Sequence, residues 1–384
     1  MAAPQPFYED RGTPIALRQV LDALSQLGYE SDVVTYPVGQ SVAIPGVRYF
    51  RLPNPLRIQS VPIGLSLRKL WFDGGMARAL RERLRSERYE CIHAVEEAAF
   101  LAVALGRRYH VPVIYDMQSS FPEQLAKFAL FQNRPAQAAL RGAERWLLRN
   151  ANLVVCSAGL GEHVRVAAPE TRLWGWRFAG IDPAVRPDDV TALRTSLDIA
   201  PQAPVVLYSG TFEQYQGLGE LLDAIPLVRA EFPDVVFVLV GARGIDGEAL
   251  KRQSSQSASD GALRLVERQP RELLPRYLAM ANVLVSPRMH GGNLPLKVFD
   301  YLAAGRPIVA TDIATHRNFL DNGRALLVAA GASELAEGIT AVLRDPALAC
   351  QLAARARMFT EEHLGWMAFV QSVYEIYQAA VTHD

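Results

Sequence analysis

A strand, a glycine pair, a helix and a second strand follow one another in this chain, and their order most constrains its fold. The apolar runs at 282–287 and 308–311 are typical of buried parallel strands. Gly291 and Gly292 open the loop between them, and a helix is expected over 295–302. The N-terminus of a helix exposes free N–H groups and about half a positive charge. This stretch therefore predicts a site for an anion, and phosphate is the usual occupant.

The same alternation of apolar runs and helical segments extends over the whole chain. Strands are predicted in the second half at 205–209, 235–240, 263–266, 282–286, 308–310 and 325–328. In the first half they are predicted at 31–36, 47–51, 91–95, 112–117 and 152–156. Helices are expected after Thr13, over 98–105, 122–149 and 159–167, and finally over 366–381. This order is typical of an α/β protein with parallel sheets covered by helices on both faces. In an α/β unit a strand should precede the first helix, but only the first five residues are available for it. This first strand is therefore expected to be very short, or the start of the chain is expected to be truncated.

Glycine and proline accumulate between Pro169 and Pro204, which favours a domain boundary there. We expect a first domain over 1–180, a second over 181–364, and a final helix over 365–384 that packs back towards the first. Trp174 and Trp176 are expected to pack at the junction.

Composition excludes several classes of protein. Lys and Arg together number 40, as do Asp and Glu, so no net charge favours nucleic acid. Cys91, Cys156 and Cys350 are far apart and form no Cys-x-x-Cys pair, which argues against disulfides and zinc. The first residues lack the pattern of a signal peptide, and no run of 18 apolar residues occurs. A cytoplasmic location is therefore expected.

Residues 47–90 form a basic segment, with ten basic side chains against four acidic ones. One interpretation is an ordinary solvated helix face. The other is attraction to anionic lipid or to a lipid-phosphate acceptor, with peripheral contact at the inner face of a membrane.

In an open parallel sheet, ligands bind at the carboxyl ends of the strands. Three loops of the second half meet this description, at 209–217, at 241–244 and at 288–295. Their candidate ligands for a diphosphate or ribose are Gly210, Thr211, Arg243, Arg288, His290, Gly291, Gly292, Asn293, Lys297 and Asp300. Gln216, Leu294 and Pro295 lie in the same loops. Each residue also has a plain structural interpretation. The glycines suit turns, Lys297 and Asp300 suit a solvated helix, and His290 and His93 suit structural roles.

The segments Asn293–Thr311, Tyr208–Gly217 and Val113–Met117 together resemble a GT-B glycosyltransferase of family 4. The resemblance covers nearly the whole chain. It implies two Rossmann-like, doubly wound parallel-sheet domains facing a central cleft. It also implies transfer of a sugar from a nucleotide-sugar donor with retention of configuration, without a metal or other cofactor. The donor is expected in the second domain and the acceptor in the first.

The resemblance places Asp300 at the position of the second glutamate in the family's paired-glutamate motif, and that glutamate holds the ribose. The segment Asn293–Leu296 stands for the backbone that holds the diphosphate, and Gly12 lies on a loop that approaches it from the first domain. Four positions depart from the family: Gly292 replaces the first motif glutamate, Thr211 and Gln216 replace an Arg and a Lys, and Gln118 replaces a histidine that contacts the donor sugar region.

These departures need not abolish catalysis, because the retaining mechanism proposed for the fold requires no enzymic base. Gln118, Arg288 and Lys297 are the expected catalytic residues, which position the reactants and stabilise the leaving diphosphate. We therefore expect a transferase with a lipid-linked, polysaccharide or other glycoconjugate acceptor. The alternatives are a nucleotide-sugar epimerase or hydrolase, and a non-catalytic homologue that binds a sugar nucleotide.

Overall fold

The computed structural model describes the chain except residues 9–11, 41, 56, 59–66, 127, 129–130, 182, 243–260, 291–294 and 383–384, and the side chains of 67, 68, 70 and 158. It forms two compact units. Unit 1 comprises Met1–Phe178 and Met367–Asp384, and unit 2 comprises Ala179–Gly291 and Pro295–Trp366.

Unit 1 contains a seven-stranded parallel sheet in the order β3-β2-β1-β4-β5-β6-β7. Its strands are β1 (Ala2–Ala3), β2 (Ser31–Thr35), β3 (Val47–Arg51), β4 (Ile92–Val95), β5 (Val113–Met117), β6 (Leu153–Cys156) and β7 (Leu173–Gly175). The first strand is indeed very short, yet it pairs with both β2 and β4 in the interior of the sheet.

The helices of unit 1 are α1 (Gly12–Gln26), α2 (Leu67–Ser86), α3 (Ala98–Tyr109), α4 (Phe121–Leu125), α5 (Arg134–Asn150), α6 (Ala158–Ala167) and α15 (Trp366–Val381). Leu17 of α1 packs with Ala3 and Val95 of the sheet. Ala2 and Ala94, which precede these two strand residues and point to the opposite face of the sheet, pack with α2, α3 and α5. Helices therefore cover both faces, as parallel sheets require.

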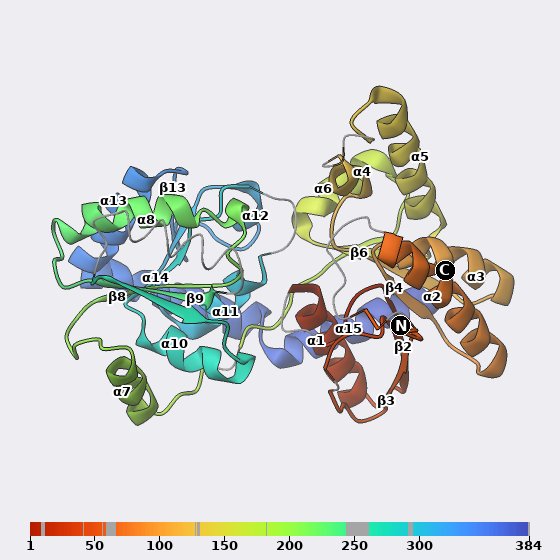
Figure 1. The fold of residues 1–384 in the computed structure, drawn as a ribbon, viewed down its shortest axis with the longest axis horizontal. Helices are drawn as coiled ribbons and strands as arrows, with labels where there is room; N and C mark the ends of the chain where they lie inside the picture. Colours follow the sequence, from red (N-terminus) through yellow and green to blue (C-terminus); the bar gives the residue numbers. More distant parts are fainter. Residues whose placement is uncertain are drawn as a thin grey trace. The chain divides into compact units, whose positions relative to one another are not determined.

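Unit 2 contains a six-stranded parallel sheet in the order β10-β9-β8-β11-β12-β13. Its strands are β8 (Val205–Ser209), β9 (Val236–Ala242), β10 (Leu263–Glu267), β11 (Val283–Ser286), β12 (Ile308–Thr311) and β13 (Leu326–Val328). Its helices are α7 (Pro187–Ser196), η2 (Gln214–Gln216), α8 (Leu218–Arg229), η3 (Arg271–Leu273), α10 (Leu274–Met280), α11 (Leu296–Ala304), α12 (Ala314–Arg317), α13 (Ala332–Arg344) and α14 (Pro346–His363). Helices α8 and α13 lie together on one face, and α10 and α11 lie on the other (Figure 1).

Several details differ from the sequence predictions. The segment 169–204 is not only a linker, because it contains β7 and α7. The helix predicted over 122–149 is two helices, since Asn133 caps the start of α5 by accepting from Ala136 N. Thr13 lies inside α1, and Pro295 precedes α11 instead of occupying its first position. None of the helices in the described part of the chain has the length and apolarity needed to cross a bilayer.

Candidate functional site

The candidate site of unit 2 lies where β8 and β11 end and α11 begins. Gly210 directly follows β8, Arg288 follows β11 by two residues, and Lys297 lies in the first turn of α11. Because β8 and β11 are paired neighbours in a parallel sheet, both strands end at the same edge. Stretches of sequence about 80 residues apart are brought together in this way.

Two glycines allow the loop after β8 to approach its neighbours closely. A Cβ on Gly210, which has φ of 146°, would lie 3.2 Å from Lys297 Nζ. A Cβ on Gly217, which has φ of 70°, would lie 1.9 Å from the carbonyl oxygen of Pro287. Any side chain at Gly217 would therefore push the loop away from the end of β11.

Lys297 is the centre of the site. Its Nζ donates a hydrogen bond to Gln216 Oε1 at 2.8 Å and lies 4.0 Å from the centroid of the Tyr208 ring. Burial, and then the positive charge of Arg288, lower the pKa of Lys297 well below its ordinary value. No carboxylate in the described part of the chain forms an ion pair with it. The ammonium group is thus positioned by neutral partners and would gain from an incoming anion.

Arg288 supplies a second cation, close enough to Lys297 to lower its pKa. Its side chain is 2% exposed, its Nε donates to the carbonyl oxygen of His290 at 2.9 Å, and its guanidinium lies 5.1 Å from the Tyr215 ring centroid. Burial lowers the pKa of Arg288. The carbonyl oxygen and the aromatic face carry no formal charge, so these two contacts do not neutralise the guanidinium.

A buried polar chain fixes the backbone at Arg288. Thr311 Oγ1 donates to the carbonyl oxygen of Arg288, and His316 Nδ1 donates to the carbonyl oxygen of Thr311 at 2.7 Å. Ser286 Oγ completes the chain at 2.9 Å from His316 Nε2. Burial lowers the pKa of His316 to about 4, so this histidine is neutral at pH 7 and acts as a structural link between the ends of β11 and β12.

Asp300 is buried, with 3% exposure, and is not the solvated helix carboxylate of the plain interpretation. Its Oδ1 accepts from Arg271 Nη2 at 2.8 Å and from the backbone N–H of Ile181 at 3.0 Å, and its Oδ2 accepts from Arg271 Nη1 at 3.2 Å. The neighbouring Tyr301 accepts from the backbone N–H of Ser209 at 2.8 Å, which ties α11 to the end of β8. Asp300 as a ribose ligand remains a prediction, and Arg271 would have to share the carboxylate.

The predicted residues divide into three groups. Unit 2 brings together Gly210, Thr211, Gln216, Arg288, His290 and Lys297, with the buried Pro295 just before α11 and Asp300 within α11. Gln118, after β5, and Gly12, at the start of α1, belong to unit 1. Arg243, Gly291, Gly292, Asn293 and Leu294 lie outside the described residues.

The sequence analysis missed Arg271, His316 and Glu96. Arg271 follows the end of β10, and Glu96 directly follows β4. Ligands gather at the carboxyl ends of parallel strands, and both residues lie beyond such ends. Nothing in the sequence around His316 distinguishes it from a surface histidine.

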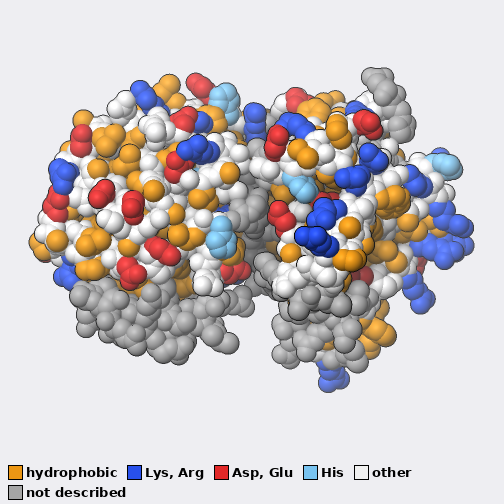
Figure 2. All heavy atoms as spheres, turned by 90° about the horizontal axis from the view of Figure 1, so that it is seen from above, with side chains coloured by type: hydrophobic (Ala, Val, Ile, Leu, Met, Phe, Trp, Pro, Cys, Tyr) orange, Lys and Arg blue, Asp and Glu red, His pale blue; other side chains and the backbone are white. Residues whose placement is uncertain are grey.

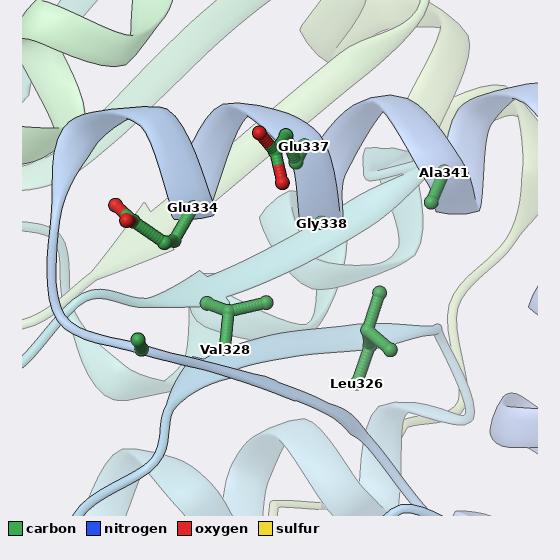
Figure 3. Close-up of a pocket in the computed structure, with 7 residues that line it drawn as sticks. Leu326, Val328, Glu334, Glu337, Gly338 and Ala341 are labelled. Carbon is green, nitrogen blue, oxygen red and sulfur yellow. The ribbon is translucent and has the colours of Figure 1, made fainter.

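A pocket of about 350 Å³ lies elsewhere in unit 2, between β13 and α13 (Figure 3). Apolar side chains and two glutamates of one helix, Glu334 and Glu337, line it. None of the residues of the candidate site contributes to this pocket, and it offers no convergent set of polar groups.

Known proteins resemble the chain in both fold and sequence. Residues 203–345 match the family described as glycosyl transferases group 1, and residues 11–159 match the glycosyl transferase 4-like domain. A phosphatidyl-myo-inositol mannosyltransferase of Mycolicibacterium smegmatis is 23% identical over 394 residues, covering 98% of this chain and 92% of its own. The sucrose-phosphate synthase of Thermosynechococcus elongatus has a TM-score of 0.79 at 21% identity, with 98% of both chains covered. Anabaena HepE in complex with UDP-glucose has a TM-score of 0.75 at 16% identity, with the same coverage.

Two Rossmann-like parallel-sheet units with these structural neighbours define the GT-B fold. The two family matches lie in different units, one in each sheet domain. The chain belongs to the group 1 glycosyltransferases.

Proposed function

We propose that the chain transfers a sugar, with retention of configuration, from a nucleotide-sugar donor to a lipid-linked, polysaccharide or other glycoconjugate acceptor. The observation that carries this proposal is the pair of cations Lys297 and Arg288 at the start of α11. They repel each other, and Lys297 pairs with no carboxylate among the described residues. A diphosphate would relieve that repulsion, and the N-terminus of α11 adds partial positive charge.

In the proposed reaction, the bond between the sugar's anomeric carbon and the phosphate oxygen breaks. The acceptor oxygen bonds to the same face of that carbon, and its proton passes to the leaving phosphate. The chain then needs no basic side chain at the reacting atom. Lys297 and Arg288 would stabilise the negative charge that develops on the leaving diphosphate, which is typically the largest catalytic contribution of such groups.

The relatives support the donor class and one acceptor class. Anabaena HepE forms a complex with UDP-glucose, and the Mycolicibacterium relative is named for mannosyl transfer to phosphatidylinositol. By analogy we propose a nucleotide sugar as donor and propose that a lipid-linked acceptor is approached from a membrane surface.

The basic segment of unit 1 supports that approach. Arg78 and Arg85 of α2 and Arg88 beyond it are exposed, and Trp71 is 59% exposed on the same helix. Figure 2 shows Lys and Arg side chains gathered at the end of the view where Figure 1 places α2 and α3. Other basic residues of the segment are engaged within the unit, since Arg48 pairs with Asp32 at 2.7 Å.

A thermal-shift screen of UDP, GDP and ADP and their sugar conjugates tests donor binding. Turnover is then followed with each conjugate that binds, and the anomeric configuration of the product is read by NMR. We expect retention, and we expect activity to survive EDTA because no metal is proposed. An inverted product would overturn the retaining mechanism. Free sugar or an epimer formed without an acceptor would favour a hydrolase or epimerase, and binding without any turnover would favour a non-catalytic homologue.

A further inference from the structure

The free edge of the unit 2 sheet is a feature that the candidate site of this unit does not use. Strand β13 is the last in the order β10-β9-β8-β11-β12-β13, and only β12 pairs with it among the described residues. The stretch Leu326–Ala330, which contains β13, consists of apolar residues, and none of the five is buried. Apolar sheet edges that remain exposed pair readily with strands of other chains. This edge therefore offers a place where an extended segment could dock.

The backbone of Leu327 is directed towards the free edge. Successive residues of a strand direct their N–H and C=O groups to alternate sides. The carbonyl oxygen of Val328 accepts from the backbone N–H of Asp312 at 2.7 Å, so Val328 and, by alternation, Leu326 bond towards β12. Leu327 lies between them and directs its N–H and C=O groups the opposite way. An incoming strand could therefore exchange two hydrogen bonds with this residue.

A groove lies beside this edge and can receive side chains. It is the pocket of about 350 Å³ between β13 and α13, and α13 runs alongside the strand (Figure 3). Leu326 and Val328 point from β13 towards the helix and form an apolar floor (Figure 3). A Cβ on Gly338 would lie 2.8 Å from Val328 Cγ1, so glycine at this position allows the close approach of α13. Side chains on one face of an added strand would lie over this floor.

Two carboxylates give the groove a negative charge. Glu334 and Glu337 of α13 line it and are exposed, and no basic side chain is among the described residues that line it. Neither glutamate forms an ion pair within the described part of the chain. The two lie nearly one turn of α13 apart, about 4.5 Å along the helix axis, and alternate residues of a strand are about 7 Å apart. Basic residues at alternate positions of an added strand could therefore reach both carboxylates.

The chemistry of such a partner follows from the groove. Lys and Arg have long aliphatic stems that cover apolar surface while their charged ends reach outward. The stems would lie over Leu326 and Val328, and the charged ends would pair with Glu334 and Glu337. The intervening residues of the partner would lie on the other face of the sheet, beside the partly exposed side chain of Leu327. β-branched residues suit these positions because they favour strands.

The charge of the groove argues against a second copy of this chain as the occupant. Antiparallel pairing of two β13 strands about a twofold axis would place both α13 helices on the same face of the joined sheet. Their glutamates would then face each other across the joint, and like charges in that arrangement destabilise strand pairing. The three residues of β13 would supply few hydrogen bonds to offset this repulsion.

We propose that the β13 edge is a docking site for an extended segment of a partner protein in which Lys or Arg alternates with β-branched residues. The segment would add a strand to the unit 2 sheet, pair its backbone with Leu327 and place its basic side chains in the groove. This binding would be additional to sugar transfer, and no residue of the candidate site takes part in it.

Fluorescence anisotropy of labelled peptides with the full chain tests this docking. The probe is Lys-Val-Lys-Val-Lys, and its controls for charge and for strand pairing are Glu-Val-Glu-Val-Glu and Lys-Pro-Lys-Pro-Lys. We expect the probe to bind at least tenfold more tightly than either control. Glu334→Gln combined with Glu337→Gln should weaken this binding about tenfold at low salt. Glu162→Gln combined with Glu170→Gln is the matched control, because it removes two exposed carboxylates of unit 1, and it should change the dissociation constant less than twofold.

Leu327→Pro removes the N–H group at the free edge but none of the hydrogen bonds to β12, and edge strands tolerate proline. It should weaken binding of the probe at least tenfold. Thermal unfolding shows whether this variant is folded; if it is not, the glutamine variants decide the question. No binding of the probe, equal binding of the probe and either control, or unchanged binding by the Glu334 and Glu337 double variant would overturn the inference. A wild-type dimer in sedimentation analysis that Leu327→Pro dissociates would also overturn it, because a second copy would then occupy the edge.

Discussion

Lys297→Met tests the catalytic role proposed for Lys297 separately from any structural one. The variant loses a hydrogen bond to Gln216 and a contact with the Tyr208 ring, which together stabilise the fold by about 2 kcal/mol. It also loses a desolvated cation that Arg288 repels, and this change stabilises the fold. Because the two effects oppose each other, we expect a net change within about 1 kcal/mol. For a domain of this size that is a shift of roughly 2–4 °C in Tm.

The effect on catalysis should be much larger. Removing one donor to a developing negative charge typically lowers kcat by about 10²–10³-fold, or roughly 2.7–4 kcal/mol in activation free energy. Steady-state kinetics and calorimetry with the preferred nucleotide sugar measure this loss. Arg344→Met is the control, because Arg344 pairs with Glu231 on the exposed surface of unit 2. This variant should change neither kcat nor the affinity for the nucleotide sugar.

The pKa of Lys297 gives this prediction a second readout. A lysine whose pKa is lowered in the folded state binds its proton more tightly when unfolded, so folding becomes more favourable as pH rises towards the ordinary lysine pKa of about 10.4. Lys297→Met abolishes this contribution, so wild-type stability should rise relative to the variant between neutral pH and that value. A variant that keeps turnover within threefold, or that loses more than about 8 °C in Tm, would refute the reasoning.

Three further predictions concern other parts of the chain. Asp300→Ala should weaken nucleotide-sugar binding and turnover at least tenfold by calorimetry and kinetics, and Arg271→Met, which leaves the carboxylate in place, should have a smaller effect on binding. Gly217→Ala should lower the free energy of unfolding by about 2 kcal/mol or more in urea titration, because φ is positive and the new Cβ would meet the carbonyl oxygen of Pro287; an unchanged midpoint would contradict the close approach. Replacing Arg78, Arg85 and Arg88 together by Ala should reduce binding to anionic vesicles about 100-fold, at about 1 kcal/mol for each arginine, with no change on neutral vesicles; equal binding of both proteins to anionic vesicles would exclude this surface.

Much of the fold could be predicted because parallel strands buried on both faces appear as continuous apolar runs. The run at 205–209 matches β8 residue for residue. The strand predicted at 47–51 also matches β3, although this edge strand is only partly buried and contains two arginines. Strand β7, Leu173–Gly175, was not predicted because three residues that include a tryptophan and a glycine show no such run. The split between α4 and α5 depends on a cap at Asn133, a local signal that a long amphipathic pattern conceals.

The candidate site was only partly predictable, because sequence shows which side chains are available but not which of them meet. Lys297 and Gln216 are 81 residues apart, and only the pairing of β8 with β11 brings them into contact. The partner of Asp300 was similarly hidden, since Arg271 comes from η3 beyond β10. Contacts of this kind depend on strand order, which the periodicity of single segments does not contain.

The contact between Lys297 and Gln216 also changes how a departure from the family is understood. The resemblance places a basic residue at position 216 in many members, and its replacement by Gln removes a charge from the loop after β8. In this chain, Gln216 Oε1 accepts from Lys297 Nζ at 2.8 Å, and Gln216 Nε2 donates to Thr211 Oγ1 at 3.3 Å. The amide therefore orients a cation that α11 supplies. A lysine restored at position 216 would bring two ammonium groups together, so Gln216→Lys should weaken diphosphate binding unless Lys297 is replaced by Gln in the same protein.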